Sequence, residues 1–241
     1  MVPQFSVYGR LFVAVCVLGV AASGTYLRAQ KFEMGAGFVA GVPAGEFGDS
    51  LDATGYGFSI RFGYLVGDGP IRVGGDFGFL RYGSEKHSEI LLSDIPDVRV
   101  DVETTNNILL GHFFLRAQPR SGAVRPYAEA LIGVSYLFTD TSIQNERTGE
   151  EFASSINLDD SVFSYGFGGG VELVLWDGMK RAGTPIPIQL LLDGRLRYLR
   201  GSNARYLKEG SISRENDQVT YEILESRTDL LLPEISLALR F

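Results

Sequence analysis

The last stretch of the chain, residues 230–241, constrains the fold more than any other segment of its 241 residues. Side chains alternate between the two faces of a strand, so this stretch would present one apolar face and one polar face. The apolar face holds Ile235, Leu237, Leu239 and Phe241, and the polar face holds Glu234, Ser236, Ala238 and Arg240. The apolar face suits contact with lipid and the polar face does not. A membrane barrel requires the same alternation in its other strands.

Seven further segments alternate in this way. Each can supply the roughly nine to eleven residues that a tilted strand needs to cross the hydrocarbon layer of a membrane. They are residues 32–41, 55–66, 71–82, 106–117, 127–138, 161–176 and 188–200. With the terminal stretch they predict an all-β fold of eight strands.

The connections between these segments also alternate, in length. The shorter ones are 67–70, 118–126 and 177–187, and the longer, mostly polar ones are 42–54, 83–105, 139–160 and 201–229. Short turns at one end and long loops at the other are typical of an antiparallel up-and-down transmembrane β-barrel, with both termini on the periplasmic side because the strand number is even. Alternating valines near Val100 and apolar residues near Tyr221 predict hairpins that protrude above the membrane.

The first 29 residues read as a secretory signal peptide. Arg10 precedes an apolar run from Leu11 to Ala22, which is too short for a spanning helix. Cleavage after Ala22 and cleavage after Ala29 both fit, and we favour Ala29 because strand alternation begins directly behind it; an uncleaved anchor is the alternative. The barrel domain is then residues 30–241, and the single cysteine, Cys16, lies outside it.

The polar faces of the strands carry a balanced set of charges. This set comprises Glu33, Arg61, Arg72, Asp76, Arg116, Glu129, Glu172, Asp193, Arg195, Arg197, Glu234 and Arg240. The alternative is a soluble lipocalin-like barrel, in which this face would meet water. However, the same face is rich in glycine, as a narrow interior needs, and its basic groups are all arginine, which suits bidentate pairing with carboxylates. We therefore assign it to the lumen.

Arginines and carboxylates in so narrow a lumen should pair, because an unpaired charge would lose its solvation without compensation. This predicts an ion-pair network that plugs the barrel, with a gated conduit as the alternative. We expect no catalytic residue, cofactor or metal: no calcium-loop spacing appears among the acidic loops, and no spacing links His112 to Ser135 or Ser164. The net charge of −7 also argues against a nucleic-acid partner.

Together these features resemble the OmpA/OmpX-like outer-membrane β-barrel family. The resemblance covers residues 31–241 through strand count, loop parity and the aromatic terminal strand, and the stretch 126–133, PYAEALIG, is typical of such barrels. It implies a Gram-negative outer-membrane protein without the peptidoglycan-binding domain of full-length OmpA. In that family Ile235, Leu237, Leu239 and Phe241 would serve as the signal read by the barrel-assembly machinery.

The resemblance also sets expectations for function. Family members act as structural proteins, in adhesion or surface defence, and some are small channels or lipid-modifying enzymes. We expect a structural or surface-interaction role, with outer-membrane lipid and lipopolysaccharide as surroundings. Loops 83–105, 139–160 and 201–229 would meet extracellular partners.

Overall fold

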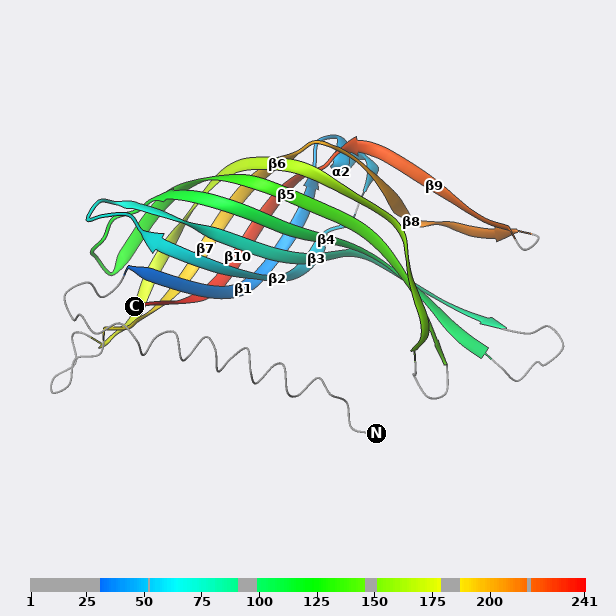
Figure 1. Ribbon diagram of the computed structural model, residues 1–241, viewed down its shortest axis with the longest axis horizontal. Coiled ribbons are helices and arrows are strands. Elements are labelled where there is room, and N and C mark those ends of the chain that lie inside the picture. The colour runs from blue at the N-terminus through cyan, green and yellow to red at the C-terminus, as the bar shows by residue number, and fades with distance from the viewer. Residues whose placement is uncertain (1–30, 52, 91–98, 146–150, 179–186, 216–217) are drawn as a thin grey trace.

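A computed structural model describes residues 31–51, 53–90, 99–145, 151–178, 187–215 and 218–241. Eight antiparallel strands form a closed barrel in the order β1-β10-β7-β6-β5-β4-β3-β2, and β8 and β9 form a separate two-stranded sheet (Figure 1). The predicted fold class is confirmed. The expected signal peptide, residues 1–29, lies outside the described residues.

The strands of the barrel match the eight alternating segments. Their bounds are β1 Phe32–Ala44, β2 Gly55–Leu65, β3 Ile71–Ile90, β4 Arg99–Ala117, β5 Val124–Asn145, β6 Glu151–Asp177, β7 Gln189–Gly201 and β10 Asp229–Arg240. Strands β8 (Asn203–Glu215) and β9 (Gln218–Arg227) and the short helix α2 (Glu46–Ser50) lie in the long connections. None of the helices in the described part of the chain is long and apolar enough to cross a membrane.

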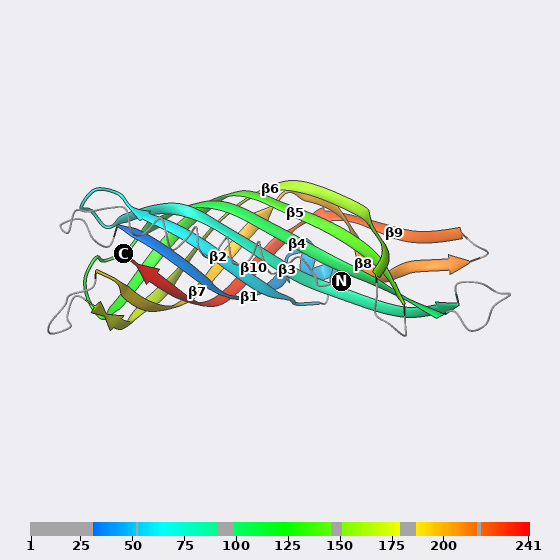
Figure 2. The same ribbon diagram turned by 60° about the horizontal axis from the view of Figure 1, so that its bottom comes forward.

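The two ends of the barrel differ. We call the end where β1 begins and β10 finishes the turn end, and the opposite end the loop end. At the loop end β3 and β4 stay paired as far as Ile90 and Arg99, and β5 and β6 stay paired as far as Gln144 and Glu151. Figure 2 shows these extensions and the β8–β9 hairpin reaching away from the barrel. The strand pairing predicted within these long connections is present.

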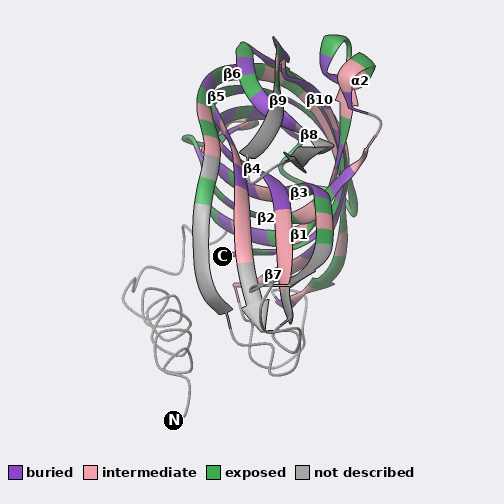
Figure 3. Ribbon diagram, turned by 90° about the vertical axis from the view of Figure 1, so that its right-hand side faces the viewer, coloured by how far each residue is buried: buried purple, intermediate pink, exposed green. Residues whose placement is uncertain are grey.

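The outer wall of the barrel is apolar. Large side chains are widely exposed there, including Phe38 at 78%, Phe113 at 75% and Tyr56 at 69%. In Figure 3 buried and exposed residues alternate along the strands, as expected when one face of each strand points outward. The twelve charged residues assigned to the lumen are buried inside the barrel, while large apolar residues of the opposite strand faces are exposed on its outside. Arg81 departs from this sidedness, because its side chain is half-exposed near the loop end.

Glycine allows close packing inside this wall. A Cβ on Gly133 would meet the carbonyl oxygen of Gly111 and lie 2.7 Å from the Cα of His112. A Cβ on Gly74 would likewise meet the carbonyl oxygen of Phe62 and the ring of Phe114. These positions let large neighbours fill a lumen that is only wide enough for side chains.

Candidate functional site

The lumen is divided into two layers. The charged layer holds the twelve ionisable residues named above and lies from the turn end to the middle of the barrel. The apolar layer, at the loop end, includes Phe47, Leu80, Leu137, Tyr206 and Leu232. Each of the twelve charged side chains is at least 94% buried. The two layers are therefore the candidate site, because any solute crossing the barrel would have to pass both.

The first part of the charged layer is a chain of ion pairs near the turn end. Arg240 places Nη2 2.6 Å from Oε2 of Glu33 and 2.6 Å from Oε2 of Glu172. Arg116 then places Nη1 3.0 Å from Oε1 of Glu172 and Nη2 2.7 Å from Oε2 of Glu129. This chain joins side chains of β1, β4, β5, β6 and β10.

Arg61 and Tyr127 extend this chain. Nη1 of Arg61 donates to Oδ2 of Asp193 at 2.7 Å, and the hydroxyl of Tyr127 donates to Oδ1 of the same carboxylate at 2.8 Å. The guanidinium of Arg116 lies 3.7 Å from the centre of the Tyr127 ring, which is a cation–π contact. Arg72 lies at the edge, with Nε 3.5 Å from Oε2 of Glu33.

The second part of the charged layer is a ring of two arginines and two carboxylates. Nη2 of Arg195 lies 2.8 Å from Asp76 and 2.5 Å from Glu234. Nη1 and Nη2 of Arg197 lie 2.9 Å from the same two carboxylates. Ser59 also donates to Oε1 of Glu234, at 2.6 Å. The ring spans the lumen from β3 to β7 and β10 through charge-assisted hydrogen bonds.

A chain of hydrogen bonds lies beside this ring. Nε2 of His112 is 2.8 Å from Oγ of Ser164, which is 2.9 Å from Oγ of Ser135. Their spacing in the sequence gives no sign of this contact, which arises because the β4–β5–β6 register brings His112, Gly133 and Ser164 into one row. All three polar side chains are buried in the lumen. The serine hydroxyls therefore face the interior of the barrel and not the acyl chains outside.

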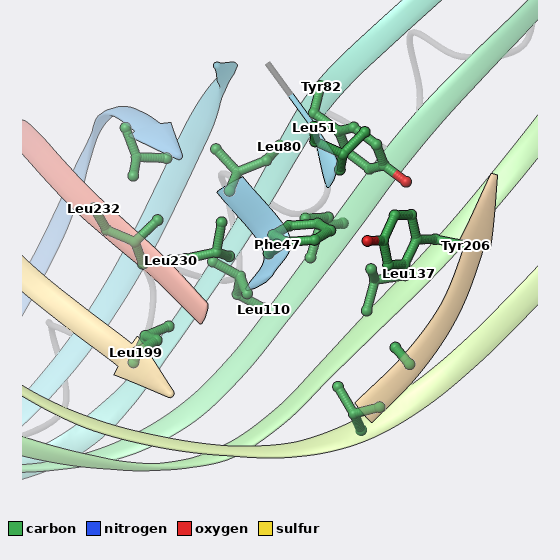
Figure 4. Close-up of a cluster of buried hydrophobic side chains, with 14 of the residues drawn as sticks. Phe47, Leu51, Leu80, Tyr82, Leu110, Leu137, Leu199, Tyr206, Leu230 and Leu232 are labelled. Atoms are coloured by element: carbon green, nitrogen blue, oxygen red, sulfur yellow. The ribbon is translucent and has the colours of Figure 1, made fainter. Parts of the chain in front are cut away.

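The apolar layer depends on α2, which the sequence analysis did not find. Connection 42–54 was expected to be a polar loop, but it folds back so that Phe47 and Leu51 are buried at the loop end. Figure 4 shows Phe47 between residues of several strands, with Tyr206 beside it at 5.0 Å between ring centres. Two apolar residues four positions apart in a polar loop were the available signal for this helix. They cover the mouth of the barrel.

Four polar lumen residues near the turn end were not among the predicted charges: Gln118, Arg125, Tyr127 and Gln189. Arg125 donates from Nη2 to Oε1 of Gln189 at 3.2 Å, and Arg240 donates from Nη2 to Oε1 of Gln118 at 3.2 Å. Tyr127 lies in the predicted segment 127–138 and shares the alternation of Glu129, and extending that segment by two residues would also have included Arg125. The charged layer described here thus includes a seventh arginine, Arg125.

The terminal strand closes the barrel against β1. Ile235, Leu237 and Leu239 point outward, while the backbone of Phe241 exchanges two hydrogen bonds of 2.9 Å with Phe32. The rings of these two phenylalanines stack, with their centres 6.3 Å apart. In the part of the chain that the structure describes, no group of three or more histidine, cysteine, aspartate or glutamate side chains is placed to hold a metal ion.

An apolar outer wall around a charged interior defines this chain as a β-barrel membrane protein. The model of the family described as outer membrane protein beta-barrel domain matches residues 12–183. The chain therefore belongs to the family of outer-membrane β-barrel domains. A search of curated proteins gives no match.

Several solved structures are similar in outline. Neisserial surface protein A (NspA) is 15% identical, with 88% of this chain and 97% of that chain covered and a TM-score of 0.39. Ail, the attachment invasion locus protein of Yersinia pestis, is 15% identical, with 88% and 99% covered and a TM-score of 0.41. A major outer membrane protein from Thermus thermophilus is 11% identical, with 87% and 99% covered and a TM-score of 0.40.

Proposed function

We propose that this protein is a structural outer-membrane barrel with a plugged lumen, whose long loops interact with the exterior, and that it is not an enzyme. The observation that carries the proposal is the succession of two filled layers. An ion would first have to displace a buried arginine–carboxylate network and then cross an apolar layer that offers it no hydration. Separating a buried charge from its partner leaves it uncompensated in the interior, which opposes spontaneous opening of the lumen.

The same proposal sets the orientation of the barrel. We place the turn end and both termini in the periplasm and the loop end outside the cell, in accordance with the usual arrangement of short turns and long loops. Outer-membrane lipid and lipopolysaccharide would surround the apolar wall. Loops 83–105, 139–160 and 201–229 would be the contact surfaces for extracellular partners, although several of their side chains lie outside the described residues.

The apolar face of the terminal strand supports recognition during assembly. We propose that Ile235, Leu237, Leu239 and Phe241 are the residues read by the barrel-assembly machinery, because three point away from the lumen and the fourth closes the seam. Phe241→Ser should slow assembly in cells more than Phe163→Ser, an equivalent change on a central strand. Equal assembly rates for the two variants would remove this part of the proposal.

Planar-bilayer recording of the purified barrel tests the plug. We expect no stable open level for the native protein. A variant that lacks the apolar cover, Phe47→Ser with Leu51→Ser, should still conduct little, because the charged layer remains. A large, stable single-channel conductance of the native protein would contradict the plugged lumen and favour the conduit.

A lipid-modifying enzyme is the second candidate, and the hydrogen-bonded chain of His112, Ser164 and Ser135 is the observation that favours it. The burial of these three side chains disfavours an enzyme, because a substrate ester must come within hydrogen-bonding reach of the nucleophile. Hydrolysis of phospholipid or lipopolysaccharide acyl chains by the folded protein, lost in Ser164→Ala and His112→Ala alike, would establish the enzyme. Activity that survives His112→Ala would eliminate this candidate.

A further inference from the structure

The β8–β9 hairpin is attached to the barrel without belonging to its sheet. Within the described part of the chain, β8 and β9 pair only with each other. The β6–β7 ladder ends at Ser164 with Gly201, and the β1–β10 ladder ends at Ala44 with Asp229. The ladders of the barrel therefore stop where the hairpin begins, and other contacts must set the position of the hairpin.

A narrow neck joins the hairpin to the barrel. The backbone N–H and the hydroxyl of Thr228 donate to the carbonyl oxygen of Ser202 at 3.3 and 3.2 Å. Asp229 accepts hydrogen bonds from the backbone N–H of Gly201 at 3.2 Å and from the hydroxyl of Tyr198 at 2.8 Å. These contacts fix where the two strands of the hairpin begin. Rotation about such a short, element-terminal segment is the usual way in which a hinge works.

Helix α2 links this hairpin to the far wall of the barrel mouth. The ring of Phe47 lies 6.2 Å from the ring of Tyr82 on β3 and 5.0 Å from the ring of Tyr206 on β8, with an edge-to-face arrangement in both pairs (Figure 4). Strand β7, which leads into β8, is four places from β3 in the closed order of eight strands. Phe47 and Tyr206 are almost completely buried. A single buried ring thus bridges the mouth from β3 to the hairpin.

The polar contacts that hold the hairpin outside its neck are exposed. The backbone N–H of Arg227 on β9 donates to Oε2 of Glu46 on α2 at 3.3 Å, and Nε of Arg227 lies 3.6 Å from Oε1 of Glu46. The backbone N–H of Arg205 on β8 donates to Oδ2 of Asp160 on β6 at 2.9 Å. Exposed contacts of this kind contribute little stability, whereas a buried aromatic ring contributes much more. The ring of Phe47 should therefore dominate the attachment.

We propose that α2 is a latch for the β8–β9 hairpin. With Phe47 in place the hairpin is held against the barrel mouth, and with Phe47 withdrawn it pivots at Ser202 and Thr228. The coupling is reciprocal, because a change that favours the withdrawn position of α2 favours the pivoted position of the hairpin by the same free energy. An extracellular partner that pulls on the hairpin would therefore loosen the cover of the mouth. Only this last step rests on the proposed role of the loops.

The distance between two spin labels on the folded protein in detergent tests the latch. The labels are attached at Ile223→Cys on β9 and Ser161→Cys on β6, both exposed positions, and Cys16→Ser removes the native thiol. We expect one narrow distance distribution in this background. Phe47→Ala should raise the ratio of pivoted to latched hairpin by roughly a hundredfold or more and add a second population. An unchanged distribution would overturn the proposal.

Matched variants separate a latch from general loosening of the loop end. Phe38→Ala on the outer wall and Asp160→Ala, which removes a hydrogen bond between β6 and β8, should both leave the distribution single. A second label pair, at Ser84→Cys on β3 and Ser161→Cys, should keep its distribution in Phe47→Ala, because the β3–β4 ladder does not pass through α2. Broadening of both label pairs would mean that the whole loop end loosens together, and would refute a latch.

The reverse substitution tests whether the coupling is reciprocal. Tyr206→Ala removes the ring that the hairpin places against Phe47 and leaves α2 itself unaltered, so it should make residues 45–54 susceptible to proteolysis. Ile223→Ala, on an exposed side chain of the same hairpin, should leave them protected. Heat-modifiable gel mobility verifies that each variant retains its barrel. Equal protection of residues 45–54 in the two variants would show that α2 and the hairpin move independently, against the proposal.

Discussion

The charged layer and the apolar layer fill the same lumen by different means. In the charged layer ion pairs reach across the barrel, as Arg61 of β2 pairs with Asp193 of β7 and Arg197 of β7 with Asp76 of β3. In the apolar layer a loop element, α2, supplies Phe47 to a cluster that the strands leave incomplete. The charged layer is formed by side chains of the barrel strands, whereas the apolar layer depends on a cover, α2, that is attached to the barrel. The two layers should therefore fail differently when they are disrupted.

The largest effect is expected in the charged layer. Arg116→Ala leaves Glu129 buried without its arginine and Glu172 with Arg240 alone, which should lower the free energy of unfolding by about 3–5 kcal/mol. This free energy is measured by denaturant unfolding in detergent micelles, with heat-modifiable gel mobility as the readout. Arg120→Ala is the control, because Arg120 is exposed and its ion pair with Asp68 spans 3.9 Å. Equal stability of the two variants would mean that the network contributes nothing to holding the barrel closed.

The next effect belongs to the apolar layer. Phe47→Ala removes a buried ring, a loss of about 3–5 kcal/mol where the structure cannot relax, but α2 can detach while the barrel stays closed. We expect proteolysis within residues 45–54 and little change in the unfolding midpoint. Phe38→Ala, on the exposed outer wall, should leave the loop protected. A large drop in barrel stability for Phe47→Ala would show that the two layers are one cooperative unit.

A smaller effect is expected at the boundary between the layers. Ser164→Ala removes the hydroxyl between His112 and Ser135 and should cost about 1 kcal/mol, the net value of a typical hydrogen bond. Unfolding in denaturant again gives the value, with Ser202→Ala as a control at an exposed position. A cost as large as that of Arg116→Ala would place this chain within the charged network.

The smallest effect is expected at the outer surface of the cover. Glu46 of α2 and Arg227 of β9 lie 3.6 Å apart with partly exposed side chains, so Glu46→Gln should cost less than about 1 kcal/mol. Limited proteolysis of residues 45–54 at low and high salt would detect the contribution of this ion pair, because salt screening weakens an exposed pair. Release of α2 as complete as in Phe47→Ala would mean that charge, and not the buried ring, holds the cover.

The barrel was predictable from the sequence because its signal is repeated. Eight segments alternate and their connections sort by length, so errors in one strand are corrected by the others. Strand β4 shows this, since its inward Ile108, Leu110 and Phe114 obscured the pattern locally yet are buried as the register requires.

The contacts inside the barrel were not predictable in the same way. Alternation places Arg61 and Asp193 in the lumen but does not pair them, because they are 132 positions apart and meet across the interior. Helix α2 has only five residues, too few to establish a period. His112 and Ser164 required the register of three strands, which alternation alone does not fix.

The pairing of β1 with β10 has a consequence for biogenesis. Glu33 and Arg240 are neighbours in the closed barrel although 207 positions separate them. One edge of β1 pairs with β2, which follows it in the chain, but its other edge stays unpaired until the last strand arrives. Such a long-range closure is slow, and its unpaired edges are open to wrong partners in the meantime. A chaperone that keeps the nascent strands apart until the carboxyl-terminal segment emerges would therefore govern the yield of this protein more than the intrinsic stability of its finished form.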